Sequence, residues 1–204
     1  MSFFKKNSYD IVKLYINQIG IAIFSTILYT AIGGLDSGNV VSGLNIGISI
    51  FAAAFYFVLL YTVSWEYGAK DKSGVDSSKL SLDKFKGVKL GLFAAIPNFV
   101  FSVIALVCTI IYRTTLSTVA GSILAITNFV IRMTMSMYLG IINEIFGSFL
   151  ATDLPMATPA FLYQTIAFAF TPLLAVAVIH VGYLLGLKNI RIFGSLSSKS
   201  GKHS

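Results

Sequence analysis

The chain is a succession of long apolar runs separated by short polar segments. A helix needs about 20 apolar residues to cross the ~30 Å hydrocarbon core of a membrane. Four runs reach that length: Leu14–Ile32, Leu44–Val63, Leu90–Ile111 and Phe161–Leu187. Polar and apolar residues do not alternate in these runs, as they would in the strands of a membrane barrel. The pattern therefore predicts transmembrane helices.

A fifth segment, Thr118–Phe149, is also long enough, but it contains polar side chains. These are Asn128, Arg132, Asn143 and Glu144. A single crossing at 118–142 makes five spans in all, whereas a re-entrant segment makes four and two crossings broken near Arg132 make six. We expect an all-α, polytopic transmembrane helix bundle of about five spans within residues 1–187. A basic, disordered tail is expected at 188–204.

The composition favours lipid as the surroundings of the chain. Charged residues make up 11% of it and hydrophobic residues 56%, whereas about 25% charge is usual in soluble domains. The formal net charge is +7, but the lysines lie in short segments beside the apolar runs. That placement is typical of membrane topology signals. We expect lipid, other membrane proteins or further copies of the chain as partners, and no nucleic acid.

The placement of lysines also predicts the orientation in the membrane. The segment 67–89 holds Lys70, Lys72, Lys79, Lys84, Lys86 and Lys89, whereas GGLDSGNVVSG between the first two runs has no lysine or arginine. Positive residues favour the cytoplasmic side, so 67–89 is predicted to be a cytoplasmic loop of a multi-pass protein of the cytoplasmic membrane. Lys5, Lys6 and Lys13 place the N-terminus on the same side. The basic tail obeys this positive-inside rule only if Thr118–Phe149 re-enters the membrane or crosses it twice. The sequence therefore does not determine the side of the C-terminus.

Ionisable groups within the apolar runs are the first candidates for a functional site. Arg132 is the foremost, because an arginine at mid-depth costs about 2.5–3.5 kcal/mol on insertion scales. Asn128 lies four residues earlier on the same helix face, and His180 in the last run is a candidate proton shuttle. One interpretation is that these side chains line a polar path. The other is that Arg132 extends to the membrane surface and that His180 forms a hydrogen bond between packed helices. On a straight helix, Glu144 is about 18 Å from Arg132 and no direct partner.

The stretch SWEYGAKDK ends the second apolar run. Trp65 and Tyr67 are aromatic residues of the kind that favour the membrane surface, and Gly68 suits the left-handed residue at a helix end. A simple helix end is one interpretation of this stretch. The other is a cytoplasmic docking patch for a soluble partner or anionic lipid, formed by Trp65, Glu66, Lys70, Asp71 and Lys72.

Other motifs add little chemistry. The sequence contains no H-E-x-x-H, G-x-S-x-G, G-x-x-x-x-G-K-[ST] or C-x-x-C pattern, so we predict a protein that is not an enzyme and has no cofactor. The methionines of Met133–Met137 do not predict a metal site, since Met135 points away from the other two on a helix. The G-x-x-x-G pairs at Gly43/Gly47, Gly87/Gly91 and Gly182/Gly186 predict close helix packing.

Three short stretches carry a resemblance to a family of proteins. They are WEYGAKD after the second run, IPN in the third, and GYLLGLKNIRIFG at the end of the last. In these stretches the chain resembles small polytopic membrane proteins of Gram-positive bacteria, some of which are grouped with five-span Yip1-like proteins. The resemblance implies a five-helix bundle in the cytoplasmic membrane and assigns no catalytic residue.

Two functions fit these observations. The first is a non-enzymatic component or scaffold of a membrane complex, which packs against other membrane proteins and docks a partner on 67–89. The alternative is a small transporter or channel built around Arg132, Asn128 and His180. Replacing Arg132 with leucine distinguishes them, because the change abolishes flux along a polar path but leaves a scaffold assembled.

Overall fold

The computed structural model describes residues 3–33, 40–78, 83–146, 156 and 158–192. These residues form helices joined by turns, and no strand occurs among them. The helices in chain order are α1 (Phe3–Gly33), α2 (Val40–Asp76), α3 (Lys86–Thr115), α4 (Thr118–Thr134), the 3₁₀-helix η1 (Ser136–Tyr138), α5 (Leu139–Phe146) and α6 (Pro159–Leu187). The predicted all-α bundle is confirmed.

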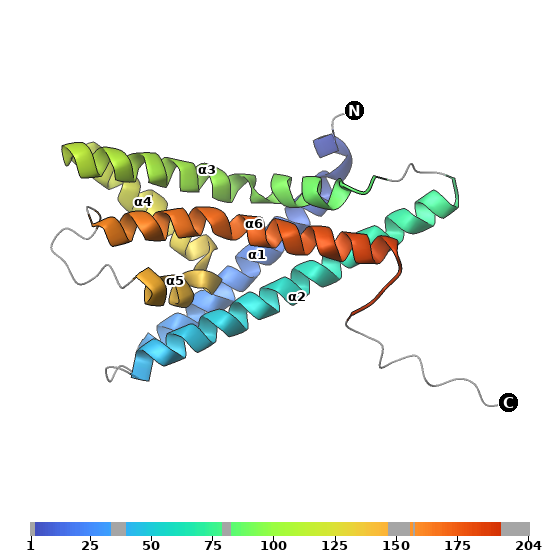
Figure 1. Ribbon diagram of the computed structural model, residues 1–204, viewed down its shortest axis with the longest axis horizontal. Coiled ribbons are helices and arrows are strands. Elements are labelled where there is room, and N and C mark those ends of the chain that lie inside the picture. The colour runs from blue at the N-terminus through green and yellow to red at the C-terminus, as the bar shows by residue number, and fades with distance from the viewer. Residues whose placement is uncertain (1–2, 34–39, 79–82, 147–155, 157, 193–204) are drawn as a thin grey trace.

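The helices α1, α2, α3 and α6 are long and apolar enough to cross a membrane. Their outward faces carry large apolar side chains that are more than half exposed, among them Ile27, Phe51, Val103 and Phe170. A continuous surface of this kind is stable in lipid and not in water. The protein is therefore an integral membrane protein that crosses the bilayer several times. Its central helix is α6, which packs along both α2 and α3 (Figure 1).

Helix α2 is longer than its apolar run. Its 37 residues extend over about 55 Å at 1.5 Å per residue, so it continues beyond the hydrocarbon core. The prediction that the helix ends at Gly68 was wrong, because Gly68 lies within α2 and packs against the backbone of Tyr183 in α6. Much of the predicted loop 67–89 is therefore helical, from Tyr67 to Asp76 and again from Lys86.

The segment predicted as a fifth span is a bent pair of helices. The axis turns by 81° between α4 and the η1–α5 segment, so 118–142 is not one straight span. Gly121 near the start of α4 lies against Tyr112 at the end of α3. At the far end of α5, the ring of Phe146 lies 6.4 Å from that of Tyr163 in the first turns of α6. The start of α4 and the end of α5 therefore lie at the same end of the bundle, as in a re-entrant hairpin (Figure 1).

Polar side chains hold this bend in place. The backbone leaves the helical conformation at Met135, with φ −123° and ψ 26°. The Ser136 hydroxyl donates to the carbonyl oxygen of Ala22 in the middle of α1, at 2.6 Å. At the start of α5, the Gly140 N–H donates to the hydroxyls of Tyr29 and Ser49, at 2.6 and 2.7 Å. The bend thus lies at mid-depth, while α5 is anchored near the end of α1 and the start of α2.

The α5 helix is too short to be a second crossing. Its eight residues extend over about 12 Å, less than half the ~30 Å of the hydrocarbon core. The four long helices α1, α2, α3 and α6 alternate in direction, and the start of α1 and the end of α6 lie at the same end of the bundle (Figure 1). This end, where α1 begins, α2 ends, α3 begins and α6 ends, is called the charged end below.

The glycine pairs have different roles in packing. Gly182 and Gly186 of α6 touch the α2 backbone so closely that an added Cβ would overlap with Ser64 and Trp65, respectively. Gly87 and Gly91 bring α3 close to α6, where an added Cβ would lie 2.8 Å from Tyr183 and 3.1 Å from Val176, respectively. At Gly43 and Gly47, by contrast, no atom lies within 4 Å of an added Cβ. Two of the three G-x-x-x-G pairs therefore form the core of this chain, and the third faces outward.

Candidate functional site

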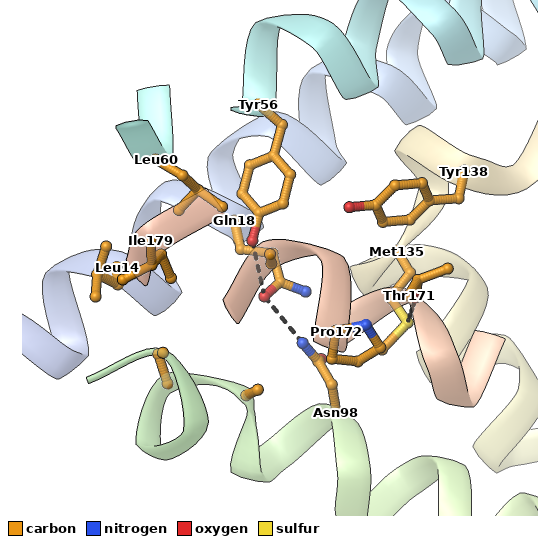
Figure 2. A pocket seen from close by; sticks show the side chains of 14 residues that line it. Leu14, Gln18, Tyr56, Leu60, Asn98, Met135, Tyr138, Thr171, Pro172 and Ile179 are labelled. Carbon is orange, nitrogen blue, oxygen red and sulfur yellow. Dashed lines mark hydrogen bonds between the residues drawn. The ribbon is translucent and has the colours of Figure 1, made fainter. Parts of the chain in front are cut away.

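The centre of the bundle contains a hydrogen-bonded cluster of uncharged polar side chains (Figure 2). The Gln18 carbonyl oxygen accepts from the Asn98 amide at 2.9 Å and from the Tyr56 hydroxyl at 3.4 Å. The Gln18 amide donates to the carbonyl oxygen of Thr134, at the end of α4, at 3.2 Å. Gln18 thus connects α1, α2 and α3 to the bend of the re-entrant pair. We call Gln18, Tyr56 and Asn98 the central amide cluster.

Two prolines lie beside this cluster. Pro97 precedes Asn98 in α3, and Pro172 interrupts α6. A proline inside a helix removes one backbone hydrogen bond. In α6, the Thr171 hydroxyl donates to the carbonyl oxygen of Phe168, which Pro172 leaves without its helical partner, at 2.9 Å. Thr171 also lies 3.3 Å from the Met135 sulfur, which ties α6 to the bend.

Several buried polar atoms in this region lack a hydrogen-bond partner among the described residues. They are Ser25 Oγ, Asn98 Oδ1, Ser102 Oγ and the Tyr138 hydroxyl. Figure 2 shows the Tyr138 hydroxyl pointing toward the Tyr56 ring. Asn98 and Tyr138 help to line a cavity of about 20 Å³, which is enough for about one water molecule. Unpaired buried polar groups are rare in folded proteins, since each costs about 1–3 kcal/mol.

Arg132 lies in the hairpin, nearer the end opposite the charged end. Its Nε donates to Asn128 at 3.2 Å, and its terminal nitrogens donate to Asn143 at 3.4 Å and to Gln164 at 2.8 Å. The guanidinium carbon is 5.8 Å from the centre of the Phe168 ring. Arg132 therefore joins α4, α5 and α6. The 81° bend makes this possible, because it brings residues of α5 back toward α4 in a way that a straight helix does not.

The residues of the predicted polar path are only partly brought together. Arg132 and Asn128 lie in contact, whereas His180 is sixteen residues beyond Gln164 in α6, about 24 Å along the helix. There its ring stacks on Phe85, with centroids 6.4 Å apart. Gln18, Asn143 and Gln164 were not among the predicted site residues. An amide in an apolar run is the signal that they share.

The predicted docking patch is partly used inside the protein. Trp65 is only 8% exposed, and its indole N–H donates to the carbonyl oxygen of Ile190 at 2.7 Å. Asp71 pairs with Lys86 at 2.7 Å. Lys72 is half-buried, while Glu66 and Lys70 are exposed. Trp65 and Asp71 therefore hold the fold together, and the exposed members of the patch are Glu66 and Lys70.

We expect Arg191 to shield Trp65 from solvent. Its guanidinium carbon lies 4.1 Å from the centre of the indole ring, and such contacts contribute about 0.5–1 kcal/mol at exposed sites. Because Trp65 is the only tryptophan, its fluorescence reports this contact directly. The Arg191→Ala variant is expected to show red-shifted emission and stronger acrylamide quenching. Lys188→Ala, which removes a neighbouring exposed charge, is the control, and equal quenching in both variants would contradict the prediction.

Within the described ranges, no three His, Cys, Asp or Glu side chains gather as metal ligands. When the chain is compared with protein-family models, curated proteins and solved structures, nothing matches. The class of this protein therefore follows from its fold alone: it is an integral membrane protein, a helix bundle with a polar centre.

Proposed function

We propose that the protein is a small membrane transport protein whose solute path passes the central amide cluster. The observation that carries this proposal is a broken helix pair whose bend meets buried, partly unpaired polar groups at mid-depth. In a membrane, broken helices are tolerated where they are buried in protein or line a cavity, and many transporters use them at their binding sites. A bundle that only packs against neighbours has no need for unpaired polar atoms at its centre.

The chemistry of the cluster favours a small uncharged polar solute. Gln18, Asn98, Tyr56 and Tyr138 offer amide and phenol groups, which donate and accept hydrogen bonds without charge. The cavity of about 20 Å³ is too small for a solute such as glycerol, so transport of such a solute requires the cavity to widen. The re-entrant pair is the element whose movement would open the path, because it ends at the cluster and does not cross the membrane.

The proposal is tested by flux measurements on the purified full chain in liposomes. Stopped-flow light scattering follows the entry of water, glycerol and urea, with protein-free liposomes as the reference. We expect faster entry of at least one of the three solutes. If all three enter protein-containing and empty liposomes at the same rate, the transport proposal is wrong and the scaffold interpretation is preferred.

We further propose that both ends of the described chain face the cytoplasm. Every lysine of the described part lies at or near the charged end, together with Arg191, whereas Arg113 lies at the opposite end. With four crossings the positive-inside rule is obeyed throughout. In a Cys108→Ala background, Ser78→Cys and Asn189→Cys are expected to resist an impermeant thiol reagent in intact cells, and Leu116→Cys to react. Labelling of Asn189→Cys but not of Ser78→Cys would contradict this topology.

A role as a component of a membrane complex is the second candidate. The last turns of α2 project beyond the other helices at the charged end (Figure 1), and Glu66 and Lys70 are exposed near that projection. A soluble partner can bind to a projecting helix end of this kind. Affinity purification from the native membrane would support this candidate if one partner is recovered in stoichiometric amount and is lost from a Glu66→Lys/Lys70→Glu variant.

A further inference from the structure

A cavity of about 340 Å³ opens at the charged end, between the first turns of α1, the last turns of α2 and the start of α3. Its volume lies in the usual range for small-molecule pockets, roughly 300–1,000 Å³. The charged side chains that line it are Lys6, Lys70, Lys86, Asp10, Asp71 and Asp83. The cavity is separate from the central amide cluster, with which it shares no lining residue.

Half of these charges are already paired within the protein. Lys86 pairs with Asp71 at 2.7 Å, and the Tyr183 hydroxyl donates to the same carboxylate at 2.9 Å. Asp83 pairs with Lys89 at 2.8 Å, and this contact holds the pKa of the Asp83 carboxyl below its usual value. These contacts form a fixed wall of the cavity.

The other three charges, Lys6, Lys70 and Asp10, form no ion pair within the described part of the chain. Lys6 and Asp10 are four residues apart, a spacing at which opposite charges pair on a straight helix. The helix is kinked between them at Asn7, which has φ −119° and ψ 18°. Asn7 is buried, and its side chain donates to the carbonyl oxygen of Phe3 at 2.9 Å.

Aromatic contacts hold the kinked first turn in place. The ring of Phe3 stacks on Phe93 of α3 at 5.7 Å, and the ring of Phe4 lies 5.9 Å from the same residue. Tyr67, which also lines the cavity, is 9% exposed, and its hydroxyl has no hydrogen-bond partner among the described residues. The cavity thus offers two ammonium groups, one carboxylate and one phenol that the fold leaves unpaired.

We propose that this cavity binds a small zwitterion that carries a phosphate and a primary ammonium group, the chemistry of phosphoethanolamine. A phosphate monoester carries about −1.5 to −2 charges at neutral pH, which complements Lys6 and Lys70, and the ammonium group complements Asp10. The same group is the headgroup of phosphatidylethanolamine, whose phosphate carries a single charge. Either source can reach a cavity at the membrane surface. The proposal does not depend on transport.

Isothermal titration of the purified full chain in detergent tests the site. The probes are phosphoethanolamine, inorganic phosphate, ethanolamine and phosphocholine, whose trimethylated nitrogen has no N–H to donate. We expect phosphoethanolamine to bind at least about tenfold more tightly than the other three. Equal binding of inorganic phosphate would overturn the proposal in favour of a plain anion site.

Matched variants locate the binding. Lys6→Gln and Asp10→Asn are each expected to weaken binding of phosphoethanolamine by about tenfold or more. Lys5→Gln and Asp76→Asn remove the same charges from nearby side chains that do not line the cavity, and they are expected to bind as the wild type does. Thermal melting of each variant checks that it is folded. Equal losses in the control variants would overturn the proposal.

A second arm separates the two sources of the ligand. Native mass spectrometry of protein from mixed phosphatidylethanolamine and phosphatidylcholine nanodiscs measures which lipid is retained. Preferential retention of phosphatidylethanolamine, lost in Asp10→Asn, supports a lipid ligand even if the free compound binds weakly. Binding of free phosphoethanolamine without lipid preference supports a soluble ligand. Absence of both, or a lipid preference unchanged in Asp10→Asn, would overturn the proposal.

Discussion

Replacing Gly182 with leucine is expected to separate α2 from α6 and to cause a large loss of stability. A Cβ at Gly182 would overlap with the Ser64 hydroxyl and would lie 2.9 Å from the carbonyl oxygen of Tyr61. The backbone of α2 cannot yield locally, because Gly68 of α2 and Gly186 of α6 lie against each other one turn further on and bring the two helices equally close there. Overpacking a well-packed core costs about 1–3 kcal/mol, and occasionally more.

The measurement is thermal melting in mild detergent, with Gly47→Leu as the matched variant. Gly47 also lies in a helix and in a G-x-x-x-G pair, but no atom lies within 4 Å of an added Cβ there. Leucine has a higher helix propensity than glycine by nearly 1 kcal/mol, so Gly47→Leu is expected to melt at or above the wild-type temperature. Equal losses at both positions would mean that the α2–α6 contact is not as close as described.

Replacing Asn98 with leucine is expected to abolish solute flux while leaving the protein folded. The change removes the amide that donates to Gln18 at 2.9 Å, and it places an apolar group beside a cavity of only about 20 Å³. Flux through the central amide cluster is expected to fall by at least about tenfold, because a polar solute loses a hydrogen-bonding partner in the cluster.

The stability of the Asn98→Leu variant is not expected to fall with its flux. Asn98 Oδ1 is buried without a partner among the described residues, so its removal relieves a desolvation cost. Gln18 keeps the Tyr56 hydroxyl as a donor. We therefore expect the melting temperature to stay equal or rise, a trade of stability for function that is common at active sites.

Thr114→Val provides the comparison for the flux measurement. Thr114 is exposed, and its hydroxyl bonds only to carbonyl groups of its own helix in the described structure. This variant is expected to retain wild-type flux. Wild-type flux in Asn98→Leu would exclude the central amide cluster as the path, whereas a lower melting temperature would show that Asn98 is a packing residue.

Some contacts of the candidate site could be predicted from the spacing of residues along one helix. Asn128 and Arg132 lie four residues apart, and they are hydrogen-bonded as the spacing predicts. Gln164 could not be linked to Arg132 in this way, because 32 residues separate them in the chain. The interpretation of Gly68 as a helix end failed for a related reason, since its neighbour Tyr183 belongs to a distant helix.

The sequence by itself determined that this is a helical membrane protein, because the length and continuity of an apolar run are local properties. Its lysines likewise predict the orientation, since the positive-inside rule depends on charge near each span. Only the tertiary structure decided that Thr118–Phe146 bends back at Met135, and that Gln18 of α1 meets the end of α4, 116 residues away. Such pairings depend on how helices pack, and apolar periodicity does not encode which helix is the neighbour.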